Sequence, residues 1–316
     1  MVRYIKNEEA EQILTMPKAI ELVEQAFRDL ADGRAFDSPR HRIRQPRGHL
    51  HFLQAVAPKI NVAGFKAGYS RRSSLVHLYD YKRARYEAII EADWMGKMRT
   101  AATTAVATRL LARADARVVA CFGAGRHGGF QLEAVCAVRK IEEAKLFGRN
   151  KERVANFCAS MSKKLGITVR AVKTAREAVA DADIINVMTP SPTPVFDGAW
   201  LEPGQHVNAT GSNALDRREV DLETIKRSDL VVVDSREVAE LECGDLLPAF
   251  EAGVIHWSHL PDLAEIVAGR REARRSDQQI TLFESQGMCI EDLYVGKHVL
   301  DDARLRNIGI DLPIDE

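Results

Sequence analysis

Three glycines in the stretch VVACFGAGRHG, residues 118–128, form the first candidate for chemistry in this chain. Gly123, Gly125 and Gly128 follow a run of small and β-branched apolar residues, and an amphipathic segment begins directly after them. This order predicts a strand, a tight turn and a helix, the geometry in which a backbone approaches a pyrophosphate and offers helix N-terminal N–H groups to it. A glycine turn that binds no ligand has the same pattern, so the flanking elements must decide.

The segments after residue 117 alternate regularly between apolar strands and helices. Strands are expected at 117–122, 144–147, 168–172, 184–189, 206–210 and 230–234, with helices between the first four. Nearly continuous apolar strands joined by helices are typical of a parallel sheet covered on both faces. The predicted fold class is therefore α/β, a doubly wound Rossmann sheet, with the glycine turn at its first strand–helix junction. This context favours dinucleotide binding over the empty turn.

The nucleotide is indicated by the end of the second strand of this sheet. An NAD site normally has an acid there, about twenty residues after the glycines, but this chain has Arg149, followed by Asn150 and Lys151. A guanidinium pairs with a 2′-phosphate, which a carboxylate would repel. NADPH is therefore favoured over NADH. The alternative is that Arg149 is a solvated residue at a helix start.

The first hundred residues lack the regular alternation of strand and helix. Apolar spacing over 16–33 predicts an amphipathic helix, and short β-rich segments at 50–56, 62–69, 75–79 and 86–91 suggest an antiparallel sheet. A second long helix is expected from residue 93 or 94 to 111. A length of 316 residues makes two domains the prior expectation.

Composition excludes several function classes. Lys plus Arg equals Asp plus Glu at 45 each, so nothing in the charge balance points to nucleic acid or an anionic membrane. The five cysteines are scattered without metal-ligand spacing, so we expect reduced thiols and no metal. The N-terminus lacks the pattern of a signal peptide and no apolar run approaches 18 residues, so a cytoplasmic protein is expected.

Several separate motifs occur in an order that resembles the ornithine cyclodeaminase/μ-crystallin family over nearly the whole chain. They are Gly64-Phe65-Lys66, Met98-Arg99-Thr100-Ala101-Ala102, the glycine turn, Thr189-Pro190-Ser191 and Leu282-Phe283-Glu284-Ser285-Gln286-Gly287. The resemblance implies a homodimer with two domains: a substrate and dimerisation domain at 1–113, to which 294–316 returns, and a dinucleotide domain at 114–293.

The resemblance also implies that Lys66, Arg99 and an arginine near residue 40 bind the carboxylate of a small substrate. Three cations without an intervening acid suit a small anion. Arg40 is ranked first and Arg42 second for the third position, with Arg44 on the same face if the segment is extended. Lys66 lies among apolar residues, where a lysine without a partner anion would lose its proton or cost several kcal/mol.

One departure from the family bears on the reaction. Asn213 matches an aspartate that is the presumed acid/base of ornithine cyclodeaminase, and an amide cannot take up a proton. Reduction of a preformed C=N bond needs no proton acceptor at residue 213, because an amide is sufficient to orient the substrate nitrogen. Asp216 or His77 could supply an acid instead.

The remaining residues implied by the resemblance contact the cofactor or the substrate side chain. Gln286 is assigned to the substrate. The cofactor set comprises Arg99, Gly123, Gly125, Arg126, His127, Arg149, Asn150, Thr189, His206, Val207, Asn208, Ala209, Arg217 and Ser285.

The sequence thus favours an NAD(P)H-dependent reductase of a small α-imino acid, with a cyclic imine such as Δ1-pyrroline-2-carboxylate or Δ1-piperideine-2-carboxylate as substrate. The alternatives are ornithine cyclodeaminase, an amino-acid dehydrogenase or iminosuccinate-type reductase, and a crystallin-like protein that binds nucleotide without turnover.

Overall fold

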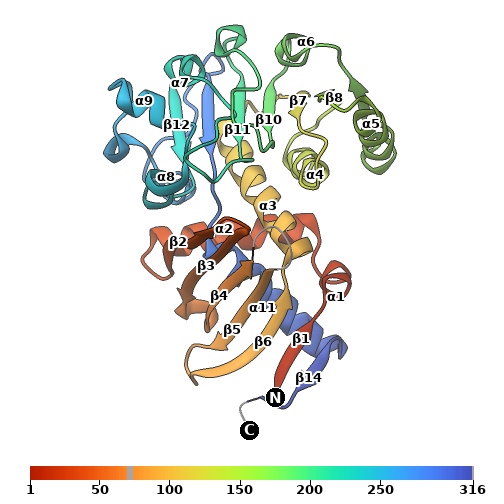
Figure 1. Cartoon of the computed structure of the whole chain (residues 1–316), viewed down its shortest axis with the longest axis vertical. Helices are drawn as coiled ribbons and strands as arrows, with labels where there is room; N and C mark the ends of the chain where they lie inside the picture. Colours follow the sequence, from red (N-terminus) through yellow and green to blue (C-terminus); the bar gives the residue numbers. More distant parts are fainter. Residues whose placement is uncertain (70–73, 315–316) are drawn as a thin grey trace. The chain divides into compact units, whose positions relative to one another are not determined.

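The computed structural model describes residues 1–69 and 74–314, which form two compact units (Figure 1). Unit 1 comprises Met1–Ala102 and Gly287–Glu316, and unit 2 comprises Thr103–Gln286. Both boundaries fall earlier than the expected 113 and 294. The first lies inside one continuous helix, α3 (Asp93–Leu111), and the second precedes α11 (Cys289–Arg306), which packs along its length on unit 1.

Unit 1 is built on a seven-stranded sheet of order β14-β1-β6-β5-β4-β3-β2. All neighbouring strands are antiparallel except β1 and β6, which are parallel. The strands are β1 (Val2–Ile5), β2 (Phe36–Gln45), β3 (Gly48–Ala57), β4 (Val62–Tyr69), β5 (Ser74–Asp80), β6 (Arg85–Glu91) and β14 (Ile310–Leu312). Pairing of β1 with β14 brings both ends of the chain to one edge of this sheet (Figure 1).

Helix α11 covers one face of the unit 1 sheet, and the amphipathic helix α2 (Met16–Ala31) packs against α11. In α2 the buried residues Ala19, Ile20, Val23 and Phe27 recur at three- and four-residue steps, as expected for an amphipathic helix. Helix α11 packs against α2 and against β3, β4 and β5. Because side chains alternate along a strand, Val62, Lys66 and their even-numbered neighbours in β4 face α11, and the odd-numbered residues face away.

Unit 2 is built on a second seven-stranded sheet, of order β12-β13-β11-β10-β7-β8-β9, with every pair parallel. Its strands are β7 (Val118–Phe122), β8 (Glu143–Phe147), β9 (Thr168–Ala171), β10 (Ile184–Val187), β11 (His206–Ala209), β12 (Leu230–Val233) and β13 (Thr281–Glu284). The chain runs outward from β7 through β8 and β9, and then in the other direction from β10. This confirms the predicted doubly wound fold.

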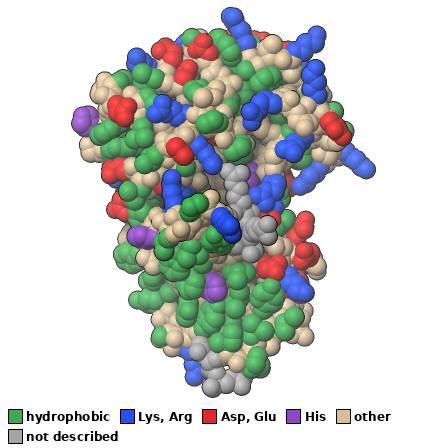
Figure 2. Space-filling view, in the orientation of Figure 1, with side chains coloured by type: hydrophobic (Ala, Val, Ile, Leu, Met, Phe, Trp, Pro, Cys, Tyr) green, Lys and Arg blue, Asp and Glu red, His purple; other side chains and the backbone are tan. Residues whose placement is uncertain are grey.

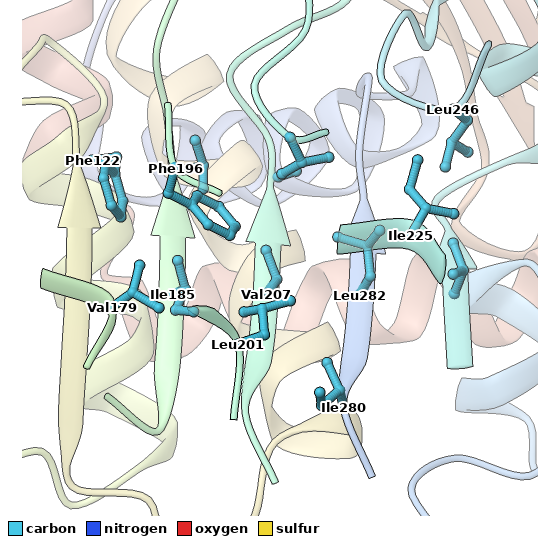
Figure 3. Close-up of a cluster of buried hydrophobic side chains, with 14 of the residues drawn as sticks. Phe122, Val179, Ile185, Phe196, Leu201, Val207, Ile225, Leu246, Ile280 and Leu282 are labelled. Atoms are coloured by element: carbon cyan, nitrogen blue, oxygen red, sulfur yellow. The ribbon is translucent and has the colours of Figure 1, made fainter. Parts of the chain in front are cut away.

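Helices cover both faces of this sheet. The longer ones are α4 (Gly128–Val138), α5 (Lys151–Leu165) and α8 (Arg236–Glu242); the shorter elements of the chain are α1 (Asn7–Glu11), α6 (Ala175–Val179), α7 (Leu222–Arg227), α9 (Leu247–Glu251), α10 (Leu263–Val267), η1 (Pro58–Ile60), η2 (Gly198–Trp200) and η3 (Trp257–His259). Figure 3 shows Phe122, Ile185, Val207 and Leu282 aligned on one sheet face, where they form part of a continuous apolar core. Among the described residues, no helix is both long and apolar enough to cross a membrane.

Candidate functional site

The glycine turn lies where the unit 2 sheet reverses its winding direction. Gly123 directly follows β7, and its φ of +113° is a conformation that favours glycine. A Cβ added there would lie 2.4 Å from the carbonyl oxygen of Met188, which follows the neighbouring strand β10. A Cβ on Gly128, the first residue of α4, would lie 2.3 Å from the carbonyl oxygen of Gly123. Both glycines are therefore required by close backbone packing.

Gly125 differs from its two neighbours because a Cβ added to it would meet nothing within 4 Å. Open space above the middle glycine, with the N-terminus of α4 directly behind it, is the arrangement in which a pyrophosphate can approach the backbone. The residues present therefore fit a dinucleotide at the switch point between β7 and β10.

Loops at the carboxyl ends of five parallel strands carry most of the predicted cofactor and substrate residues of unit 2. Parallel strands end at the same edge of a sheet, so these loops share one edge. They hold Arg126 and His127 after β7, Arg149 and Asn150 after β8, Thr189 after β10, Ala209, Asn213 and Arg217 at or after β11, and Ser285 and Gln286 after β13. Arg149 is exposed, and the side chain of Asn150 caps α5 by accepting from the Arg153 N–H at 2.8 Å.

Three predicted cofactor residues lie instead inside the sheet. His206 begins β11, and its ring nitrogens contact Thr281 Oγ1 at 2.9 Å and Asn208 Oδ1 at 3.0 Å. Burial lowers the pKa of His206 to about 3, so the ring is neutral. Val207 belongs to the apolar core, and Asn208 donates to Thr108 and Asn186. All three residues are fully buried and their polar side-chain atoms are hydrogen-bonded within unit 2, and the prediction that they contact the cofactor stays a prediction.

Two buried carboxylates position the loops at this edge. Glu219 accepts from the backbone N–H groups of Thr189, at 2.5 Å, and Gly211, at 2.6 Å. Asp245 in turn accepts from the N–H groups of Glu219 and Val220. Burial and the charge of Asp245 raise the pKa of Glu219 to about 8, and burial raises that of Asp245 to about 6. The loops after β10 and β11 are thus held by one carboxyl group.

A third buried acid, Glu284, lies close to this pair. One ligand atom from each of Cys243, Asp245 and Glu284 falls within 4.8 Å of the others, a grouping that could hold a metal ion. Burial and Asp245 raise the pKa of Glu284 well above its usual range, and burial does the same for Cys243. A protonated thiol and a protonated carboxyl group bind metal weakly. The expectation that the protein holds no metal stays a prediction.

Unit 1 contains a buried cluster of charged side chains on the α11 face of its sheet. Lys66 on β4 contacts Asp292 Oδ1 of α11 at 3.0 Å, and Arg99 on α3 contacts the same oxygen at 3.3 Å and Glu291 Oε2 at 2.5 Å. Lys66 and Arg99 are only 8% and 6% exposed, and both acids are fully buried. The expectation that no acid lies between the cations is therefore wrong, because Asp292 contacts both of them. Burial lowers the pKa of Lys66 against the opposing effect of Asp292. Burial also disfavours the charge of Arg99, but Asp292 and Glu291 outweigh it and raise its pKa.

Glycines make room for both cations of this cluster. A Cβ on Gly96 would lie 2.9 Å from Lys66 Nζ, and one on Gly287 would lie 2.6 Å from Arg99 Nη1. Gly287 also has a φ of +85°. Gly287, the last residue of the Leu282–Gly287 motif, is therefore needed to admit the Arg99 guanidinium, a reason that the sequence alone did not reveal.

The arginines of β2 differ in their relation to this cluster. Arg40 donates to the carbonyl oxygen of Gly287 at 3.3 Å, and its charge acts on Lys66. Arg42 pairs across the sheet with His51, and Arg44 is exposed. Both Arg40 and Arg42 also act on His51, so the ranking of Arg40 before Arg42 stays a prediction.

His51 on β3 was not anticipated as part of the cluster. Burial, followed by the charges of Arg40 and Lys66, lowers its pKa to about 4, so the ring adds no charge near neutrality. Its Nε2 lies 3.3 Å from Ser74 Oγ.

The two residues considered as substitute acids are placed differently. His77 pairs with Phe65, whereas Lys66 pairs with Val76, so His77 lies on the opposite face of the sheet from the cluster. Its ring stacks on Phe65 and its Nδ1 contacts the Tyr86 hydroxyl. Within one chain His77 therefore faces away from the Lys66 cluster, and its role as a substitute acid stays a prediction. Asp216 is exposed in the loop after β11.

The fold and these groups define a two-unit protein with a Rossmann dinucleotide-binding unit and a unit that buries a cluster of cations. The chain belongs to the ornithine cyclodeaminase/mu-crystallin family, whose sequence model matches residues 2–307.

Relatives within this family include reductases and dehydrogenases. A Delta(1)-pyrroline-2-carboxylate reductase of Bacillus cereus is 35% identical over 77% of this chain and 75% of its own length. The Thermococcus litoralis enzyme of the same name, solved with NADH and L-proline, has a TM-score of 0.95 at 34% identity, over 98% of this chain and 100% of that one. An archaeal alanine dehydrogenase dimer with bound NAD has a TM-score of 0.93 at 30% identity, over 99% of both chains.

Proposed function

We propose that this protein is an NAD(P)H-dependent reductase of a small cyclic α-imino acid, and that it converts Δ1-pyrroline-2-carboxylate or Δ1-piperideine-2-carboxylate to the corresponding L-amino acid. The observation that carries the proposal is the buried cluster of unit 1. Lys66, Arg99 and Arg40 supply three positive charges, and Asp292 and Glu291 supply two negative ones. Cationic side chains held close together in this way suit the carboxylate of a small substrate.

The proposed chemistry divides between binding and orientation. Lys66, Arg99 and Arg40 hold the carboxylate, which fixes the ring of the imine. NAD(P)H held by the residues of the glycine turn would supply the hydride that reduces the protonated C=N bond to an amine. The amide oxygen of Asn213 accepts a hydrogen bond from the protonated nitrogen, and Gln286 contacts the substrate side chain.

Asn213 is the residue that separates this reaction from cyclodeamination. Oxidation of ornithine and release of ammonia need a group that takes up and returns protons, and an amide does neither. The alanine dehydrogenase among the relatives supports a second candidate, amination and reduction of an open-chain 2-oxo acid.

The cofactor residues proposed here are those at the carboxyl edge of the unit 2 sheet together with Arg99. Arg149 and Asn150 take the adenosine ribose, and Arg149 selects NADPH by pairing with its 2′-phosphate. Thr189, Ala209, Arg217 and Ser285 take the nicotinamide half, and Gly123, Gly125, Arg126 and His127 take the pyrophosphate.

We also propose a cytoplasmic homodimer. All five cysteines are free thiols, which fits a reducing compartment. The unit 1 sheet face opposite α11 is rich in apolar side chains, and such a face is typical of an interface between subunits.

The decisive experiment is a steady-state panel of cyclic imines, open-chain imino acids and ornithine, assayed with NADPH and with NADH. We expect reduction of at least one cyclic imine. Ammonia release from ornithine with NAD would overturn the argument from Asn213. Nucleotide binding without turnover of any compound would favour a ligand-binding protein.

A paired substitution tests the carboxylate site. Lys66→Met keeps the length of the side chain but removes its charge. The KM for the imine should rise by about thirtyfold or more, because the substrate carboxylate then lacks the ammonium group with which it pairs. Lys59→Met is the matched control, since Lys59 also pairs with a buried acid, Asp29, elsewhere in unit 1. Equal effects of the two changes would argue against the site.

A further inference from the structure

Asp292 makes contacts that set it apart from the other acids of unit 1. A single oxygen, Oδ1, contacts both Lys66 Nζ, at 3.0 Å, and Arg99 Nε, at 3.3 Å. The carboxylate therefore fixes the two cations relative to each other, although they come from β4 and α3. Its second oxygen, Oδ2, is closed to solvent and has no hydrogen-bond partner among the described residues.

The burial of Asp292 shows how it can act. Its side chain is fully buried beneath Lys66 and Arg99, which keep 8% and 6% exposure. The two cations thus keep a small exposed surface, and Asp292 keeps none. Any effect of Asp292 on the substrate must pass through the cations it holds.

Among the described residues, six other groups act on Lys66, Arg99 or their neighbours, and one of them is Asp37 of β2, which accepts from the Ile290 N–H of α11 and acts on Cys289. Arg40 from β2 repels the Lys66 ammonium, as does Arg99 from α3. Glu291 neutralises Arg99. His51 from β3 is neutral near pH 7, and Cys289 at the start of α11 stays a thiol because burial raises its pKa. Asp292 is therefore the anion, within this set, that contacts Lys66 directly and favours its protonated form.

We propose that Asp292 is a positioning residue for the reaction, which keeps Lys66 protonated and aligned with Arg99 so that the pair binds the carboxylate of the imino acid. This inference rests on the proposed function for the identity of the substrate, but its physical content is the protonation state of Lys66. A merely structural ion pair would hold α11 on the sheet without changing how the affinity for a carboxylate depends on pH.

The test uses pyrrole-2-carboxylate, a planar analogue that cannot be reduced in place of the imine, with calorimetric binding to the NADPH-saturated protein between pH 6 and 10. In the native protein, affinity should be constant at low pH and fall once Lys66 loses its proton. In Asp292→Asn the affinity at pH 7 should fall by tenfold or more, and the decline should begin at least one pH unit lower. Asp292→Glu, which keeps the charge, should restore part of both.

Two further variants make the result specific. Lys66→Arg replaces the ammonium with a guanidinium that stays charged over this range, so adding Asp292→Asn to it should produce no shift of the decline. Asp29→Asn is the control, because Asp29 is also fully buried and ion-paired in unit 1 but contacts Lys59, Arg34 and Tyr294. It should leave the pH dependence of binding unchanged.

Each outcome decides the inference. The role of Asp292 is overturned if the affinity of Asp292→Asn for the analogue begins to fall at the same pH as that of the native protein. It is also overturned if Asp29→Asn shifts that pH equally, or if the native protein does not bind the analogue. If the shift occurs but the native protein reduces no cyclic imine, the role of Asp292 stands and the proposed substrate is wrong.

Discussion

Arg149 is the residue on which the proposed preference for NADPH depends. It is exposed between the end of β8 and the start of α5, next to the strand that carries the glycine turn. Arg149→Asp should raise the KM for NADPH by about tenfold to a hundredfold, because a bidentate ion pair becomes a repulsion, and should change the KM for NADH far less. Steady-state kinetics with both cofactors measures the difference.

Arg153→Asp provides the matched control for this prediction. Arg153 is equally exposed, in the first turn of α5, and the substitution makes the same change of charge. Its effect on the two cofactors should be small and similar. Parallel losses for NADPH and NADH in Arg149→Asp would remove the assignment of Arg149 to the 2′-phosphate.

The cations of the Lys66 cluster could be predicted from the sequence, but the acids that pair with them could not. Lys66 and Arg99 could be named because they lie in recognisable motifs, but Glu291 and Asp292 could not. The signal was present, since two adjacent acids interrupt an apolar run from Cys289 to Val295, and buried acids require cationic partners. Which cations they meet depends on the packing of α11 on β4, and no local pattern encodes that contact.

At the scale of elements, Glu219 is the feature that links two loops of the Rossmann unit. Its carboxyl group holds the backbone after β10 and after β11, where Thr189 and Asn213 lie. Burial and Asp245 raise its pKa from 4.5 to about 8. The folded state thus binds this proton more tightly than the unfolded state. The proton on Glu219 therefore stabilises the folded state. Its contribution to the free energy of unfolding is fully present below pH 4.5 and is lost as pH rises through about 8.

Glu219→Gln should therefore flatten the pH dependence of stability. One pKa unit corresponds to about 1.4 kcal/mol, so the native protein should lose on the order of 4 kcal/mol between pH 4.5 and 8 from this group, and the variant should not. Urea midpoints at pH 5, 7 and 9 measure this. Glu223→Gln, at an exposed position in α7, is the control and should reproduce the native profile. If Glu219→Gln shows the same pH dependence of its urea midpoints as the native protein, the raised pKa of Glu219 does not contribute to stability as proposed.

Most helices and strands could be predicted from the spacing of apolar residues along the sequence. The strands of the parallel sheet are continuous apolar runs, and α2 and α3 have clear helical spacing or strong alanine content. The strands β1 and β14 were missed because they are short and pair only with each other and β6, contacts far apart in sequence. β2 was hidden by its charges and Pro39, which suit an edge strand but weaken the apolar alternation.

At the scale of the whole molecule, the uncovered face of the unit 1 sheet needs an explanation. Phe52, Phe65 and His77 form a continuous stack across three strands, with ring centroids 4.8 and 4.4 Å apart. Figure 2 shows hydrophobic side chains gathered over β4–β6, on the side away from α11. Exposed apolar residues extend the face at Phe36, Ile43, Leu50 and Tyr69. Monomeric proteins seldom expose a contiguous patch of this kind.

A second copy of this chain is the occupant we propose for that face, in line with the dimer described for the related alanine dehydrogenase. Phe65→Lys places a charge at the centre of the aromatic stack, and desolvating it in an interface would cost several kcal/mol. We expect the native protein to sediment as a dimer and the variant as a monomer with native circular dichroism. Leu241→Lys, at a 57% exposed position on α8, changes another surface apolar residue and should remain dimeric. If Phe65→Lys stays a folded dimer, the interface lies elsewhere and the apolar face has another partner.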